Sequence, residues 1–429
     1  MTSLLPVSVT GYSSRKFLVI ISIVISALVI DISLSNISDM ISVSTSWGFA
    51  AFIAIAIVYA VGQYLILDFV KQKSKNIRFR SPHFNKLYII MIIVQYILTV
   101  IIISVILQML VNSYYSTSML TWSSSISYAA AGVIMVILAL EFFSWYRSNR
   151  NSVIFLYGIS SIITGISAAS SLVFFTIILQ GMPAEIIAPS PTELTSEQEE
   201  VGHSEQEEVG HGPDIRKFDQ STISGKVQIV YVVSHILSFL LLWGSTAMLL
   251  HTYSKKLGKI KFWAIITIPI ASFLSIFVLV TPFVMSLSHN SGDADTIFKV
   301  TVDALGYTLP ATVSSILFGL PFFMIAKRLN HSSILKDYMI IAGSGFALFA
   351  LATSGSVMLA SYPPLGLASV SFVGISCYLI LIGIYYSTIS MSEDVKLRQA
   401  IRKSAASESK LLVSIGSDQM KQKIEKKVI

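Results

Sequence analysis

Ten apolar stretches, separated by polar segments, run through most of the chain. A stretch of about 20 apolar residues is long enough to cross a bilayer as a helix. Because backbone groups in hydrocarbon must bond within their own segment, we expect helices despite the many isoleucines and valines. The predicted spans cover residues 17–37, 47–69, 87–111, 122–145, 152–180, 226–252, 260–287, 297–326, 337–360 and 366–391. The pattern predicts an all-α polytopic transmembrane helix bundle of about ten spans.

The composition agrees with a lipid environment. The chain has 429 residues, of which 54% are hydrophobic and 12% are charged, whereas a soluble domain carries roughly 25% charged residues. Its one cysteine, Cys377, excludes an intrachain disulfide and a thiolate metal site.

Lysine and arginine predict the orientation, since cytoplasmic loops retain them. Of the 30 basic residues, 26 lie before the first span, after each even-numbered span, or in the tail. Both termini are therefore expected in the cytoplasm. The start leaves an alternative: Arg15 and Lys16 followed by apolar residues resemble a cleavable signal peptide. We favour an uncleaved first span, because apolar residues resume past Asp31 and cleavage would leave nine spans.

The chain divides into four parts. Residues 1–180 hold spans 1–5, residues 181–225 form an external loop, residues 226–391 hold spans 6–10, and residues 392–429 form a cytoplasmic tail. The loop carries ten acidic and two basic residues in this range before Lys226. Such a composition buries too little apolar surface to fold alone, so we expect disorder.

A duplicated segment lies inside this loop: SEQEEVGH occupies residues 196–203 and again 204–211. His203 and His211, with the neighbouring glutamates, are weak candidates for binding a divalent metal. A duplicated spacer is the favoured interpretation, because a disordered segment lacks the fixed geometry that metal affinity needs.

Ionisable residues inside membrane spans are candidates for function. Asp31, His235, Lys299 and Asp303 are predicted at similar depth on the outer side. They form a candidate intramembrane polar site, an outward-facing vestibule in which Asp31 or Asp303 takes a proton or cation. The alternative is interfacial snorkelling with a local Lys299–Asp303 pair.

Prolines are confined to the second half of the spans. Pro269 and Pro282 lie in span 7, and Pro310 and Pro321 lie in span 8. Each removes a backbone hydrogen bond and kinks its helix. The freed carbonyls can line a cavity or meet another helix, so the kinks fit either a transport pathway or packing.

Small residues and the tail point to contacts. Ser161, Gly165 and Ala169 in span 5, and the segment 342–345 (AGSG) in span 9, have spacings that let helix backbones approach closely. The tail, residues 392–429, is basic and amphipathic, which is typical of a segment that lies on an anionic leaflet or binds a partner helix.

No sequence feature supports an enzyme or a bound cofactor. The motifs GxxxxGKS/T, HExxH and GxSxG do not occur. A membrane haem would need facing histidines, but His235 and His251 share one predicted helix on nearly opposite faces. We expect no cofactor and no nucleic-acid partner.

The C-terminal part resembles a group of uncharacterised multi-pass membrane proteins from ammonia-oxidising archaea. The residues that carry the resemblance are 362–369 (YPPLGLAS), 408–412 (ESKLL) and 415–416 (IG), over about 70 residues. That group has no established activity, so the resemblance implies a cell-membrane location.

Two function classes remain. A transporter or channel for a small solute or cation is favoured by the kinked spans, the polar site and an outer side that holds fifteen of the 23 acidic residues. A membrane sensor or assembly scaffold is favoured by the acidic external loop and the basic tail. An inverted-repeat transporter is disfavoured, since its broken spans recur in both halves, and spans 1–5 lack proline.

Overall fold

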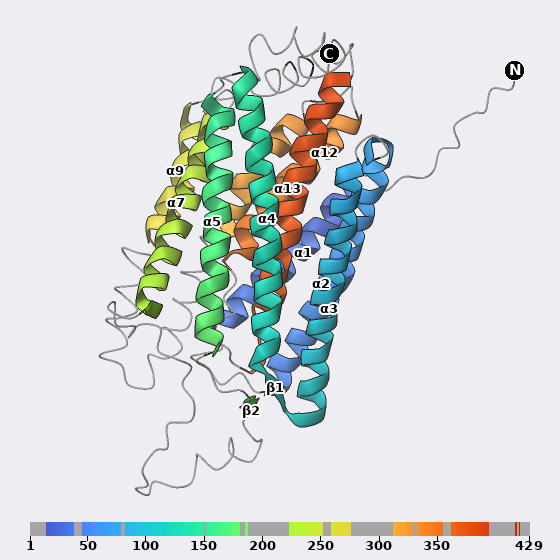
Figure 1. Ribbon diagram of the computed structural model, residues 1–429, viewed down its shortest axis with the longest axis vertical. Helices are drawn as coiled ribbons and strands as arrows, with labels where there is room; N and C mark the ends of the chain where they lie inside the picture. The colour runs from blue at the N-terminus through green and yellow to red at the C-terminus, as the bar shows by residue number, and fades with distance from the viewer. Residues whose placement is uncertain are drawn as a thin grey trace, which may run out of the picture.

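Helices form nearly all of the described chain (Figure 1), which confirms the predicted all-α fold class. The computed structural model describes residues 14–37, 45–78, 82–149, 152–180, 185–187, 223–251, 259–275, 312–327, 329, 333–354, 362–393, 417 and 420. The helices are α1 (Ser14–Ile37), α2 (Thr45–Arg78), α3 (Pro82–Asn112), α4 (Thr117–Asn149), α5 (Ser152–Gln180), α7 (Ile223–His251), α9 (Lys259–Ser275), the unlabelled helix Thr312–Lys327, α12 (Ser333–Ala352) and α13 (Leu367–Glu393).

Eight of these helices are long and apolar enough to cross a membrane. The chain is therefore an integral membrane protein. The described helices follow the order of the ten predicted spans. Spans 7 and 8 are represented by the shorter apolar helices Phe262–Ala271 and Thr312–Lys327, and parts of both predicted spans lie outside the described residues. The number of crossings stays a prediction.

Two short strands accompany the helices. β1 (Tyr114–Ser116) follows α3, β2 (Glu185–Ile187) follows α5, and they pair antiparallel with Tyr115 opposite Ile186. The acidic loop, for which the composition predicts disorder throughout, is thus anchored near its start, and its last three residues begin α7. Its other residues, including His203 and His211, lie outside the described ones. We call the end of the bundle that holds these strands the outer end.

The opposite, inner end gathers four helix ends, those of α1, α2, α12 and α13. The Ser14 hydroxyl at the start of α1 donates to the Asp337 carboxylate near the start of α12. Lys73 near the end of α2 forms an ion pair with Asp337, with 2.7 Å between Nζ and Oδ2. Tyr338 of α12 follows Asp337, and its ring lies 5.4 Å from that of Tyr386 near the end of α13. The end of α13 is therefore close to the start of α1. This arrangement agrees with the up-and-down order that the basic residues predict.

The last helix, α13, forms the centre of the bundle. The most apolar stretch of α13 is entirely buried, compared with 28% of the corresponding stretch in α3 and 17% in α7. α13 packs against α1, α2, α3, α4 and α12, and in Figure 1 it runs behind α4 from the strand end towards the inner end. A helix that is apolar on all sides fits either a buried position or lipid, so its central place was not predictable.

Glycines bring α12 and α13 into backbone contact. A Cβ atom at Gly345 would lie 2.7 Å from the backbone nitrogen of Ile380, and one at Gly383 would lie 2.5 Å from that of Ala342. Gly343 and Gly319 approach each other in the same way, joining α12 to the helix Thr312–Lys327. The close contact predicted for segment 342–345 is present.

Hydroxyl groups link other helix pairs within the membrane region. Ser127 of α4 donates to the Val370 carbonyl of α13 at 2.6 Å. Between α5 and α7, Thr164 and Ser238 lie 2.8 Å apart, as do Ser170 and Ser234. Interhelical bonds of this kind contribute about 0.6 kcal/mol each, so these pairs mainly fix the helix register.

Candidate functional site at the outer end of α13

Asp31, the first of the predicted polar-site residues, caps the buried helix α13. Its Oδ1 accepts a hydrogen bond from the Gly366 backbone N–H at 2.8 Å. Its Oδ2 accepts from the Ser369 N–H at 3.0 Å and from the Ser369 hydroxyl at 2.7 Å. The first N–H groups of a helix have no intrahelical acceptors, and a carboxylate there satisfies them and meets the positive end of the helix dipole. Asp31 therefore joins the end of α1 to the start of α13.

This geometry differs from the predicted vestibule. A vestibule requires a carboxylate that solvent reaches, whereas Asp31 is fully buried (0% exposed) and has three donors within the protein. His235 on α7 is partly exposed, and its ring lies 5.9 Å from that of Tyr231 on the same helix. Lys299 and Asp303 lie outside the described residues.

A tyrosine stack covers the same end of α13. Tyr115 of β1 is fully buried and stacks on Tyr362, with 6.3 Å between the ring centroids. Burial, together with the neighbouring Tyr362, raises the pKa of Tyr115, and burial raises the pKa of Tyr362, so both hydroxyls stay neutral near pH 7. Tyr362 precedes α13 by a short turn, which places β1, β2 and the helix start in one assembly. The sequence held no signal for this stack, since the two tyrosines are far apart in the chain.

Backbone details hold β1 against α3. The amide N–H of Ser116 donates to Gln108 Oε1 at 3.1 Å. Ser113, between α3 and β1, has a φ of 56°, and its N–H donates to the Met109 carbonyl at 3.2 Å. The chain therefore turns tightly after α3, and Tyr115 is directed into the bundle.

The proline kink in α9 meets another helix. Pro269 lies inside α9, where a proline lacks one N–H and pushes the preceding turn apart. The Trp243 indole N–H of α7 donates to the Ile266 carbonyl in that turn at 3.2 Å. The space between α7, α9 and the helix Thr312–Lys327 at this level is about 10 Å³, at most room for a single water. At Pro269 the packing interpretation of the kink is thus favoured.

Replacing Trp243 with phenylalanine tests this role. We expect the free energy of unfolding to fall by about 1 kcal/mol, because the Ile266 carbonyl loses its donor. The measurement is equilibrium unfolding in mixed detergent micelles. Trp263→Phe is the control, because Trp263 on α9 is 63% exposed and should change stability little; an equal loss from the two substitutions would contradict a role of Trp243 at the kink.

The other predicted kinks are only partly described. Pro321 lies buried within the helix Thr312–Lys327. Gly319, two residues before it, forms the close contact with Gly343. Pro282 and Pro310 lie outside the described residues.

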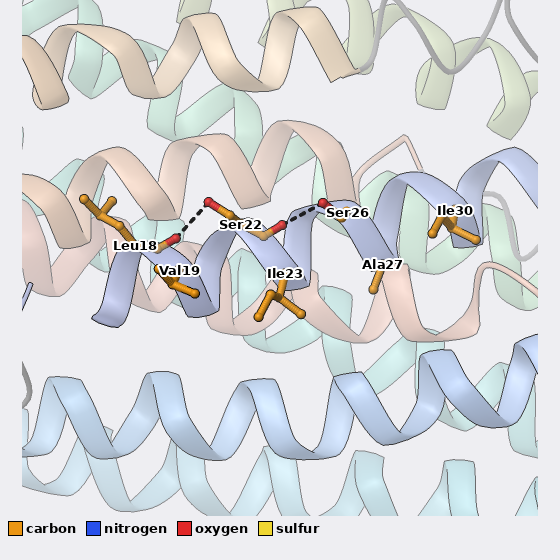
Figure 2. Close-up of a pocket in the computed structure, with 7 residues that line it drawn as sticks. All are labelled: Leu18, Val19, Ser22, Ile23, Ser26, Ala27 and Ile30. Carbon is orange, nitrogen blue, oxygen red and sulfur yellow. Dashed lines mark hydrogen bonds between the residues drawn. The ribbon is translucent and has the colours of Figure 1, made fainter. Parts of the chain in front are cut away.

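A surface hollow of about 540 Å³ runs along one face of α1 (Figure 2). Its lining belongs to α1 alone: Leu18, Val19, Ser22, Ile23, Ser26, Ala27 and Ile30. Both serine hydroxyls donate to carbonyls of their own helix, Ser22 to Leu18 and Ser26 to Ser22, at 2.9 Å. The face therefore offers apolar surface rather than a site for a polar solute.

A polar cluster joins α2 to α3 near the middle of both helices. Tyr59 donates to Gln95 Oε1 at 3.0 Å, and Gln63 Nε2 donates to the Thr99 hydroxyl. Gln63 Oε1 and Gln95 Nε2 have no hydrogen-bond partner among the described residues. Sequence reasoning missed this cluster, because it singled out ionisable residues within the spans, and these side chains are uncharged.

Among the described residues, no group of three or more His, Cys, Asp or Glu side chains is placed to hold a metal ion. No protein-family model matches the chain, and comparisons with curated proteins and with solved structures find no similar protein. A function for this integral membrane protein must therefore be inferred from its own geometry.

Proposed function

We propose that the protein is a cell-membrane sensor or assembly scaffold in which α13 couples the external acidic loop to the cytoplasmic tail. The loop would receive the signal or partner, and residues 392–429 would recruit a protein or contact the membrane surface. The cell membrane is the location that the resemblance to archaeal membrane proteins implies.

One observation carries this proposal: the loop and the tail are attached to opposite ends of the same buried helix. β2, at the start of the loop, pairs with β1, and Tyr115 of β1 stacks on Tyr362 immediately before α13. Asp31 fixes that end of α13. At the inner end, Tyr386 of α13 contacts Tyr338 of α12, whose hydroxyl donates to the Lys73 carbonyl of α2 at 2.8 Å. A rigid helix with contacts at both ends can transmit a displacement of one end to the other.

Transport of a small solute or cation is the rival function. Its ion-site version placed the proton or cation on Asp31 or Asp303. Asp303 lies outside the described residues, and Asp31, a fully buried carboxylate with three internal donors, is poorly suited to exchange a cation with solvent. The kink at Pro269, also counted for transport, is occupied by packing. The sensor or scaffold is therefore preferred.

A coupling measurement tests the proposal. The full chain is placed in nanodiscs, and hydrogen–deuterium exchange of the peptides from 392–429 is measured with and without millimolar Ca²⁺, a probe for the acidic loop. We expect exchange in the tail to change roughly fivefold, the lower end of usual coupling between two sites. Tyr115→Ala should abolish the response, because it removes the contact with Tyr362.

Tyr114→Ala is the matched control, since Tyr114 lies on the same strand but is only partly buried. It should leave the response intact. A tail that responds neither to Ca²⁺ nor to deletion of residues 196–211 would count against the sensor. Na⁺ flux into proteoliposomes that is lost in Asp31→Asn, with stability unchanged, would support transport instead.

A further inference from the structure

The outward face of the α2–α3 hairpin carries two exposed tyrosines. Tyr64 of α2 is 69% exposed and Tyr96 of α3 is 70% exposed. Apolar side chains that are also exposed surround them, namely Ile57, Val61, Ile89, Ile93 and Val100. Neither tyrosine hydroxyl has a hydrogen-bond partner among the described residues.

Both tyrosines lie deep in the membrane. The candidate spans are Ser46–Ser74 and Asn85–Asn112. At 1.5 Å per residue, Tyr64 lies about 6 Å and Tyr96 about 4 Å from the middle of its span, both towards the inner end. The hydrocarbon core extends roughly 15 Å to each side of the middle. Membrane tyrosines normally lie at the interfaces, so a hydroxyl at this depth needs a partner that lipid tails do not supply.

The two side chains point to the same side of the hairpin. Gln63 contacts Thr99 and Tyr59 contacts Gln95, and Tyr64 and Tyr96 each follow a glutamine of this contact by one residue. One residue is a rotation of 100°, and on two antiparallel helices these rotations run in opposite senses and bring both side chains to one side. That side faces away from α13, because Tyr59 packs on Phe372 of α13 with ring centroids 5.0 Å apart.

We propose that this face is the interface of a homodimer whose two-fold axis runs along the membrane normal. Such an axis keeps every residue at its own depth, so Tyr64 and Tyr96 of one copy meet Tyr96 and Tyr64 of the other at nearly the same level. Two hydroxyls at equal depth on one face make the surface self-complementary, as a two-fold interface requires. A second copy thus satisfies both hydroxyls. This inference does not depend on the sensor role.

Cysteine cross-linking tests the dimer directly. Cys377 is buried, so single cysteines added to the full chain report on their own positions. In liposomes at low protein-to-lipid ratio, Tyr64→Cys and Tyr96→Cys proteins reconstituted together should give a mixed disulfide-linked dimer under mild oxidation, because these two positions face each other across the axis. Val133→Cys, at a similarly exposed site on α4 (60%), should stay monomeric. Cross-linking at Val133→Cys equal to that of the mixed pair, or none between Tyr64→Cys and Tyr96→Cys, would overturn the proposal.

The hydroxyls are tested separately by subunit-exchange fluorescence in the same liposomes. Tyr64→Phe with Tyr96→Phe should weaken dimerisation about tenfold, the loss expected for a few interhelical hydrogen bonds in a membrane. Val61→Trp should weaken it by steric clash, and Val133→Trp should not. A protein that is monomeric in these liposomes, whatever it binds in cells, refutes the homodimer.

Discussion

Asp31→Ala is expected to lower the free energy of unfolding by about 3 kcal/mol, because three buried donors lose their acceptor at once. The donors are the N–H of Gly366 and both the N–H and the hydroxyl of Ser369. Asp31 is fully buried, so water cannot replace its carboxylate as the acceptor. The measurement is equilibrium unfolding in mixed micelles, followed by circular dichroism or tryptophan fluorescence.

Two further variants grade the effect. Asp31→Asn keeps one acceptor oxygen but turns an amide donor towards other donors, so its loss should be intermediate. Ser369→Ala removes one of the three hydrogen bonds, at about 1 kcal/mol. Asp68→Asn is the control, because Asp68 is partly exposed and bonds Gln72 of its own helix at 2.8 Å; it should change stability little. An Asp31→Ala protein as stable as the wild type would show that the carboxylate is not the helix cap.

The order of the helices was predictable because lipid makes long apolar runs unmistakable. The helix ends were less so. The predicted span ended at residue 69, whereas α2 continues to Arg78. The prediction stopped early because the last turns of α2 are polar. A polar extension ends the hydropathy signal but not the helix. β1 and β2 were missed since three-residue strands carry no alternation that could be recognised.

The role of Asp31 could not be read from its surroundings in the sequence. An acidic residue inside a span is flagged as a functional candidate whether it binds an ion or a helix end, and its partners here lie more than 330 residues later. The segment that supplies these partners belongs to residues 362–369, which carry the archaeal resemblance. Asp337 was not flagged at all, although it joins α1, α2 and α12 at the inner end, because an acidic residue close to a predicted span end looks interfacial.

Gly383→Ala should destabilise the protein by about 2–3 kcal/mol, the upper part of the usual range for overpacking a tight contact. The added Cβ would lie 2.5 Å from the Ala342 nitrogen and 2.7 Å from its Cα. These are backbone atoms of a fully buried helix pair, so the clash cannot be relieved by rotating a side chain. α12 and α13 must separate, and the polar contacts at both ends of α13 must shift with them. Gly383→Val should be worse and should reduce the amount of folded protein in the membrane.

Gly165→Ala on α5 is the matched control for Gly383→Ala, and we expect the opposite change in stability or none. Its new Cβ would meet its nearest neighbour, Val136, at 3.6 Å, which is ordinary contact. Alanine favours a helix over glycine by roughly 0.5–1 kcal/mol, so Gly165→Ala should be neutral or slightly stabilising. Helix propensity changes equally in the two variants, and the difference between their unfolding free energies therefore isolates the backbone contact of α12 with α13. If both variants had the same stability, α13 would not be held at the distance from α12 that places its two ends in the outer and inner contacts.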